Sequence, residues 1–322
     1  MSFTFSDLFA GIGGMRIAFE TFGGECILTC ENNENALKTY KLNFKDKQSH
    51  IYHRDILTLV DNIKIPRHDI LLAGFPCQPY SIAGLRKGLK DVRGGEVFTS
   101  IIDILKLSKP KAFLLENVKN MKSHDKGKTF EYMLSQLESC GYHTTSKILN
   151  SMEHANIPQN RERVFIVGFQ KQNIIDKFTF PKKIKLTKTI QDCINQSIVD
   201  EKYYYTDRYD CYSSLKSSIN NEKTIYQWRR VYPRENKNNV CPTLTFNMGS
   251  GGHNVPIFKT SYPLKDGVNI RKLTPRETAN FQGFPKSFSF PEIADSHLYN
   301  QFGNSVTVPL IKKIANEILK VL

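Results

Sequence analysis

The chain has 322 residues, of which 40% are hydrophobic, and its 45 Lys and Arg exceed its 31 Asp and Glu by a formal charge of +14. This composition excludes a mainly disordered, collagen-like or low-complexity chain, and no apolar run reaches the roughly 18 residues that a membrane helix needs. The positive charge favours polyanionic partners, with a lysine-rich solvated surface as the alternative reading. The seven scattered cysteines and the absence of a basic leader region predict no disulfide framework, no signal peptide and a cytoplasmic location.

Short apolar runs alternate with helical patterns in the first half, which predicts an α/β fold with a parallel sheet and crossover helices. Cys26 and Cys30 have a spacing that a metal could use, but no second pair accompanies them, so no metal site is predicted. The predicted strands are 3–9, 26–30, 69–74, 112–116, 144–149 and 164–169, and the predicted helices include 96–107 and 129–139.

The composition and the hydrophobic patterning change after about Phe180. Beyond this residue Lys, Arg and Tyr become frequent, helical periodicity weakens and the only Trp, Trp228, occurs. This predicts a separate, smaller and irregular domain. An apolar stripe from Leu310 to Leu322 then predicts a final helix that packs on the first-half sheet. We therefore expect one domain of residues 1–185 plus 297–322 and a second of residues 186–296.

A strand runs into a glycine turn over residues 7–14, a pattern that lets a ligand approach the backbone closely. Glu31 follows the second strand, where an acid accepts hydrogen bonds from ribose hydroxyls. Asp55 and Ile56 follow a possible third strand and suit an adenine amino group and ring. Together these residues outline a nucleoside-type cofactor site, and they leave open whether the cofactor is a dinucleotide or S-adenosylmethionine.

A strand over 69–74, apolar after its first residue, leads into Cys77, which lies in a proline-stiffened turn followed by a polar, basic, glycine-rich loop. Open α/β sheets place their chemistry at the carboxyl ends of parallel strands, and nearby Arg and Lys favour a thiolate. Glu116 ends another apolar strand, and Arg161 and Arg163 immediately precede the strand 164–169. These residues predict a nucleophile, a carboxyl group and cations at one edge of the sheet.

Six sequence blocks resemble, in order, those of DNA (cytosine-5) methyltransferases of the bacterial restriction–modification type. Asn32 departs from that pattern, since many relatives carry an aromatic residue after the glutamate. The resemblance implies a Rossmann-like S-adenosylmethionine-dependent methyltransferase sheet with a smaller target-recognition domain. The matching blocks are residues 7–14, 74–78, 116–118, 159–163, 271–277 with 282–285, and 301–306.

The chemistry of C5 methylation gives the predicted catalytic residues their roles. A thiolate that adds to cytosine C6 makes C5 nucleophilic, and Cys77 suits that step. Glu116 suits a proton or hydrogen bond at N3. The resemblance assigns the cytosine O2 to Arg163, and to Arg161 the support of the thiolate or of Glu116.

The resemblance also implies the ligands. The cofactor is S-adenosyl-L-methionine, and the partner is double-stranded DNA bound by a monomer, with a separate cognate restriction endonuclease. The implied cofactor residues are Phe9, Gly11, Gly13, Gly14, Glu31, Asp55, Ile56, Pro76, Asn304, Ser305 and Val306. The implied DNA-binding residues are Gln78, Ser81, Arg93, Arg229, Arg230, Arg234, Thr243 and Leu244.

Three other readings stay open at this point. An RNA cytosine-5 methyltransferase would use the same chemistry, but the long recognition region favours DNA. A nicotinamide-dependent dehydrogenase would explain the glycine turn and leave Cys77, Glu116 and Arg163 without a common purpose. A binding protein without catalysis would not need an intact Cys77 and Glu116.

Overall fold

The computed structural model describes residues 2–76, 92–229, 231–236, 238–249 and 254–322. The chain forms two compact units. The first comprises Met1–Leu149, Glu162–Lys182 and Leu310–Leu322, and the second comprises Asn150–Arg161 and Lys183–Pro309. No helix in the described part of the chain is long and apolar enough to cross a membrane.

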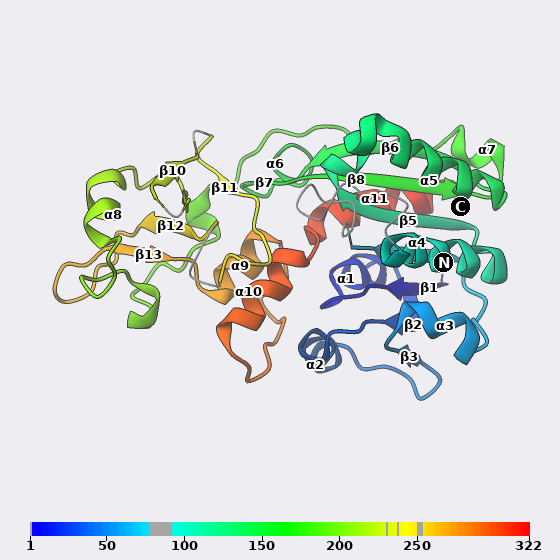
Figure 1. The fold of residues 1–322 in the computed structure, drawn as a ribbon, viewed down its shortest axis with the longest axis horizontal. Coiled ribbons are helices and arrows are strands. Elements are labelled where there is room, and N and C mark those ends of the chain that lie inside the picture. The colour runs from blue at the N-terminus through cyan, green and yellow to red at the C-terminus, as the bar shows by residue number, and fades with distance from the viewer. Residues whose placement is uncertain (1, 77–91, 230, 237, 250–253) are drawn as a thin grey trace. The chain divides into compact units, whose positions relative to one another are not determined.

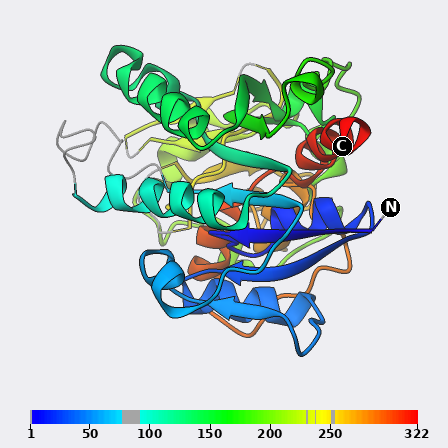
Figure 2. The same cartoon turned by 90° about the vertical axis from the view of Figure 1, so that its right-hand side faces the viewer.

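The first unit is built on a seven-stranded sheet of order β3-β2-β1-β4-β5-β8-β6 (Figures 1 and 2). The neighbours from β3 to β5 pair in parallel, whereas β8 runs antiparallel to β5. The strand order reverses between β1 and β4, which is where doubly wound sheets bind their ligands. The strands are β1 (Phe3–Leu8), β2 (Gly24–Cys30), β3 (Ile51–His53), β4 (Ile70–Gly74), β5 (Ala112–Val118), β6 (His143–Asn150) and β8 (Glu162–Phe169).

Helices cover both faces of this sheet. Apolar side chains of α3, α4 and α5 share one core cluster with Leu8, Leu71 and Leu115 of the strands. On the other face, Phe19 of α1 contacts the ring of Phe5, and α11 lies opposite α4 and α5 (Figures 1 and 2). The helices are α1 (Gly14–Glu20), α2 (Glu34–Asn43), α3 (Ile56–Asn62), α4 (Val92–Ser108), α5 (Lys128–Ser139), α7 (Gln172–Ile175) and α11 (Val308–Val321), with the 3₁₀ segment η2 (Lys119–Gly127).

The second unit contains an antiparallel sheet of order β10-β9-β12-β13 and a two-stranded parallel sheet of β7 and β11. Its strands are β7 (Gln159–Asn160), β9 (Tyr226–Trp228), β10 (Pro233–Glu235), β11 (Cys241–Pro242), β12 (Pro256–Lys259) and β13 (Ile270–Lys272). Its helices are α6 (Ser151–His154), α8 (Tyr212–Ser218), α9 (Pro275–Phe281) and α10 (Asp295–Asn304), with 3₁₀ turns η3 (Ile190–Asp192) and η4 (Glu201–Tyr203).

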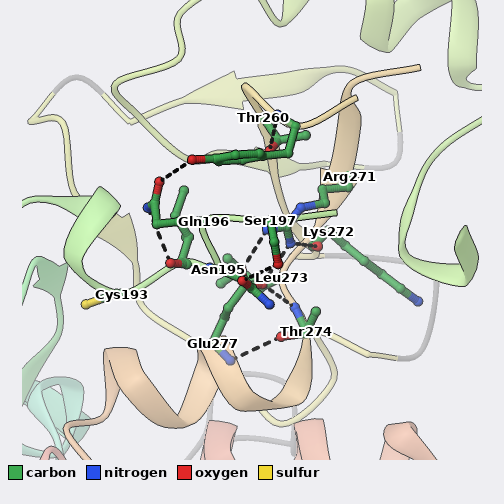
Figure 3. Close-up of polar contacts among 12 residues, drawn as sticks. Cys193, Asn195, Gln196, Ser197, Thr260, Arg271, Lys272, Leu273, Thr274 and Glu277 are labelled. Atoms are coloured by element: carbon green, nitrogen blue, oxygen red, sulfur yellow. Dashed lines mark hydrogen bonds and ion pairs between the residues drawn. The ribbon is translucent and has the colours of Figure 1, made fainter. Parts of the chain in front are cut away.

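A buried ion pair fixes the start of α9 in this second unit (Figure 3). The guanidinium of Arg271 donates to both carboxylate oxygens of Glu277, at 2.8 and 2.7 Å, and the two side chains are 0% and 1% exposed. Glu277 also accepts from the backbone N–H groups of Thr274 and Asn195. Glu277 thus ties the loop after η3 to the N-terminus of α9. Its charge strengthens each of these hydrogen bonds.

The sequence predicted the α/β class and the parallel-rich sheet correctly, and each of its six predicted strands overlaps one of β1, β2, β4, β5, β6 and β8. The final helix is also present as α11 and belongs to the first unit. The units differ in extent from the predicted domains, because residues 150–161, 183–185 and 297–309 join the second unit. Backbone bonds explain this, since β7 pairs with β11 and Val308 N–H donates to Gln282 O.

Candidate active site

The turn after β1 has the backbone geometry that a close ligand requires. Phe9, Gly11 and Gly13 have φ of 55°, 55° and 82°, a left-handed conformation that costs a non-glycine residue such as Phe9 roughly 1–2 kcal/mol. A Cβ at Gly13 would lie 2.3 Å from the ring of Phe44, whereas a Cβ at Gly11 would meet nothing within 4 Å. Gly14 then begins α1 and is buried. Open space therefore lies over Gly11.

Glu31 follows β2 and is tied to this turn. Its carboxylate accepts from the backbone N–H groups of Gly11 and Asn33, both at 2.7 Å. Burial raises the pKa of Glu31, against the lowering effect of these bonds. Each carboxylate oxygen keeps a lone pair for a further donor, so the group suits a ligand hydroxyl.

Asp55 and Ile56 lie where β3 leads into α3. Asp55 caps α3, since Oδ1 accepts from Leu57 N–H at 3.0 Å, and Ile56 is buried in the core cluster at 6% exposure. Arg54 ties this loop to the one after β2 by donating to Glu34 Oε1 and Asn32 O. The predicted residues on β2 and β3 are therefore held at the same edge of the sheet.

Glu116 and Arg163 form an ion pair at the same edge. Arg163 Nε lies 3.0 Å from Glu116 Oε1, and the side chains are 16% and 11% exposed respectively. Glu116 lies opposite Gly74 in the β4–β5 ladder, and a Cβ at Gly74 would come within 3.7 Å of Glu116 Oε2. The structure thus brings two of the predicted catalytic residues together beside the end of β4.

The segment after β4 is fixed by a residue that the sequence reasoning left without a role. Asn117 is 3% exposed, and its Nδ2 donates to Phe75 O at 3.1 Å. Pro76, which follows, is exposed. The sequence signal for this role was the position of Asn117 directly after Glu116. A side-chain amide at the end of a strand can hydrogen-bond to the loop that follows the neighbouring strand. Cys77, Gln78 and Ser81 lie outside the described residues.

Arg161 lies in the second unit, where its guanidinium donates to main-chain oxygens. Its Nη1 donates to Leu244 O at 2.8 Å, and its Nη2 donates to Gly303 O at 3.1 Å and Ser305 O at 2.6 Å. The side chain is 2% exposed. These bonds hold two segments of the chain together. Sequence spacing could not reveal this, because all three acceptors are main-chain atoms distant in the chain.

Gln159 performs a similar task two residues earlier. Its Nε2 donates to Phe281 O at 2.7 Å, and its Oε1 accepts from Leu244 N–H at 3.1 Å. Thr243 Oγ1 donates to Asn160 O at 2.6 Å. The predicted pair Thr243 and Leu244 is therefore held by the block at residues 159–161.

The remaining predicted residues of the second unit differ in exposure. Asn304 is exposed, Ser305 is half-buried and Val306 is 8% exposed. Arg229 is half-buried and Arg234 is exposed. Arg230 lies outside the described residues, and in the first unit Arg93 lies in the first turn of α4.

The family model of C-5 cytosine-specific DNA methylases matches residues 3–320. The chain belongs to this family. The type II methyltransferase M.Bsp6I of Bacillus sp. (strain RFL6) is 48% identical over 98% of both chains. M.HpaII of Haemophilus parainfluenzae is 39% identical over 99% of this chain and 89% of its own length, and M.HhaI of Haemophilus parahaemolyticus is 36% identical over 98% and 93%. The methylase is thus a C-5 cytosine DNA methyltransferase of the bacterial type II kind.

Solved structures show the same fold. The Entamoeba histolytica methyltransferase EhMeth superposes with a TM-score of 0.74 over 99% of this chain and 98% of its own, at 19% identity. The S. pombe Dnmt2 methyltransferase gives 0.72 over 99% of both chains, at 17% identity. At these identities the likeness concerns the fold of the methylase alone.

Proposed function

We propose that this methylase transfers a methyl group from S-adenosyl-L-methionine to C5 of a cytosine that has left a specific short duplex DNA sequence, through a covalent bond between Cys77 and C6. The observation that carries the proposal is the Glu116–Arg163 pair at 3.0 Å. It puts a hydrogen-bonding carboxyl group and a guanidinium together at the carboxyl end of β5. A pyrimidine offers N3 and O2 as neighbouring partners for such a pair.

The residues of the chain then have distinct roles. The Cys77 thiolate adds to C6, and the electron pair moves toward N3 and O2, where Glu116 supplies the proton and Arg163 a hydrogen bond. C5 becomes enamine-like and takes the methyl group, and the electron pair of the broken sulfur–methyl bond stays on sulfur, which leaves as a neutral thioether. A base then removes the C5 proton, the electron pair expels the Cys77 thiolate, and N3 returns its proton. Extruding the base costs a few kcal/mol, which contacts to the DNA backbone offset.

The turn after β1 fits the methyl donor. The open space over Gly11 and the two lone pairs of Glu31 suit a nucleoside, with Phe9 and Gly13 forming the turn, and Asp55 and Ile56 the adenine end. The donor supplies an electrophilic sulfonium methyl group. Pro76 and the segment Asn304, Ser305 and Val306 complete the proposed cofactor residues.

The second unit is proposed to recognise the target. Arg229, Arg230, Arg234, Thr243 and Leu244 are its proposed DNA contacts, with Gln78, Ser81 and Arg93 from the first unit. Because the relatives are named type II methyltransferases, we infer that the protein is the modification half of a restriction–modification system. It would act as a monomer in the cytoplasm, beside a separate cognate endonuclease.

Methylation of duplex DNA and of transfer RNA with a radiolabelled donor tests the substrate. We expect C5 methylation of DNA at one short sequence, read by bisulfite conversion, and none of RNA. Labelling of transfer RNA alone would favour an RNA enzyme of the same fold.

A DNA substrate with 5-fluorocytosine at the target tests the covalent step. The fluorine cannot leave as a cation, so we expect the donor to trap the protein on DNA as a complex stable to denaturing gel electrophoresis. The variant Cys77→Ala is the matched control and should form none. Trapping by Cys77→Ala, or methyl transfer by it, would refute the role of this sulfur.

A further inference from the structure

One face of the four-stranded sheet of the second unit is apolar. Tyr226 of β9 and Ile257 of β12 pack with Leu215 of α8 in one apolar cluster. Successive side chains of a strand point to opposite faces, so Gln227 lies on the other face. Arg234 of β10 lies directly opposite Gln227 in the ladder and shares that face.

Two arginines converge on Gln227 there. Its Oε1 lies 3.3 Å from Arg229 Nη1 and 3.2 Å from Arg234 Nη2. Since guanidinium groups only donate, the amide oxygen must be the atom that faces both of them. Gln227 is 6% exposed, so its own position is fixed by packing.

A second residue holds Arg229. Asn254 Oδ1 accepts from Arg229 Nη1 at 2.7 Å. Asn254 has a φ of 65°, and its N–H donates to Trp228 O at 2.9 Å. The backbone of β9 thus places this amide beside the guanidinium.

The cluster is not neutralised within the described part of the chain, where neither Arg229 nor Arg234 forms an ion pair with a carboxylate. The adjacent Glu235 accepts from Asn221 Nδ2 instead. Two cations held by one neutral oxygen repel each other, so a partner rich in acceptors would stabilise them. The same hairpin leaves Val231 80% and Tyr232 56% exposed.

We propose that Arg229 reads a guanine in the major groove of the target sequence and that Gln227 and Asn254 are the positioning residues that hold its plane. Among the described residues, the side-chain hydrogen bonds of Arg229 use Nη1, and none of them uses the edge formed by Nε and Nη2. That edge matches guanine O6 and N7, and a two-stranded ribbon such as β9–β10 fits the major groove. The inference rests on the proposed function, since it needs a duplex DNA substrate.

Methylation of a randomised duplex library, read by bisulfite sequencing, tests the assignment. We expect a guanine at a fixed position in the wild-type site. Arg229→Ala and Arg229→Lys should each lower the preference for that guanine by about 10- to 100-fold and keep the preferences at the other positions, because one bidentate pair is lost. Arg229→Lys retains the positive charge, so it separates recognition of the guanine from electrostatic attraction to the DNA.

Gln227 supplies a sharper test. Gln227→Ala should lower the preference at the same position, whereas Gln227→Glu, which retains an acceptor oxygen, should keep it. Arg208→Ala is the control, because it removes an exposed charge of the same unit and should change no preference. Binding of S-adenosylmethionine by each variant, measured by calorimetry, confirms that the protein is folded.

The outcomes separate two failures. Equal loss of methylation at all sequences in Arg229→Ala and Arg229→Lys, or a wild-type site without guanine, would overturn the assignment. A wild-type protein that methylates no duplex at all would overturn the proposed function instead.

Discussion

Charged side chains are paired differently at the carboxyl edge of the seven-stranded sheet and around Gln227 of the four-stranded sheet. At the first, Glu116 is paired with Arg163, and Glu31 accepts two backbone N–H groups. At the second, Arg229 and Arg234 share only a neutral amide oxygen. A site that carries out chemistry needs its own groups preorganised before the substrate arrives. The proposed recognition surface instead keeps its positive charge for the DNA, and such charge raises both affinity and association rate.

The sharpest test of the first region is Glu116→Gln. The amide keeps the shape and the hydrogen-bonding atoms but cannot give up a proton to N3, so we expect kcat to fall by about 10²- to 10⁴-fold. Single-turnover methylation measures this. The DNA dissociation constant should change little, and a loss confined to DNA affinity would contradict the catalytic role.

The contribution of the buried Arg271–Glu277 ion pair to the stability of the second unit can be measured by removing one charge. Glu277→Gln leaves the fully buried Arg271 without its counter-charge, and we expect the free energy of unfolding to fall by about 3–5 kcal/mol. Urea denaturation checks this value. Glu25→Gln is the control, because Glu25 and its partner Lys47 are 45% and 69% exposed and such a pair contributes only about 0–1 kcal/mol. Equal losses in both variants would show that burial does not decide the effect.

The two regions also differ in how far the sequence could predict them. The place of strand-end residues such as Glu31 and Glu116 at one edge of the sheet could be predicted, because parallel strands bring their carboxyl ends to the same edge and alternating apolar runs predict such strands. The partners of Arg161 and Gln227 were not found. Arg161 bonds to main-chain carbonyls that no side-chain pattern reveals. The face of Gln227 depends on the register of strands only three residues long.

The substitution Arg161→Lys tests whether the bonds of Arg161 to main-chain oxygens support donor binding. Arg161→Lys keeps the charge, but one ammonium group cannot reach all three carbonyls now held, so the segments at Leu244 and Ser305 should loosen. Since one lost bond to a charged group is equivalent to about a tenfold change in an equilibrium constant, we expect the donor dissociation constant to rise by about that factor. Calorimetric titration with S-adenosylmethionine measures it. A large fall in kcat with unchanged donor binding would instead support a direct role beside the reacting base.

The smallest expected effect concerns Glu31. Its two oxygens accept from Gly11 and Asn33 at once, and an amide has only one acceptor oxygen, so Glu31→Gln must turn an N–H₂ group toward one backbone N–H. The turn over Gly11 should then lose part of its fixed shape, and a ribose would lose a charged acceptor. We expect the donor dissociation constant to rise by up to about tenfold while the guanine preference attributed to Arg229 stays intact. Glu25→Gln, which alters an exposed acid at the opposite end of β2, is the control. If Glu31→Gln changed the sequence preference and left donor binding as it was, the division of labour between the two sheets would be wrong, because an acid on the first would then be acting in recognition.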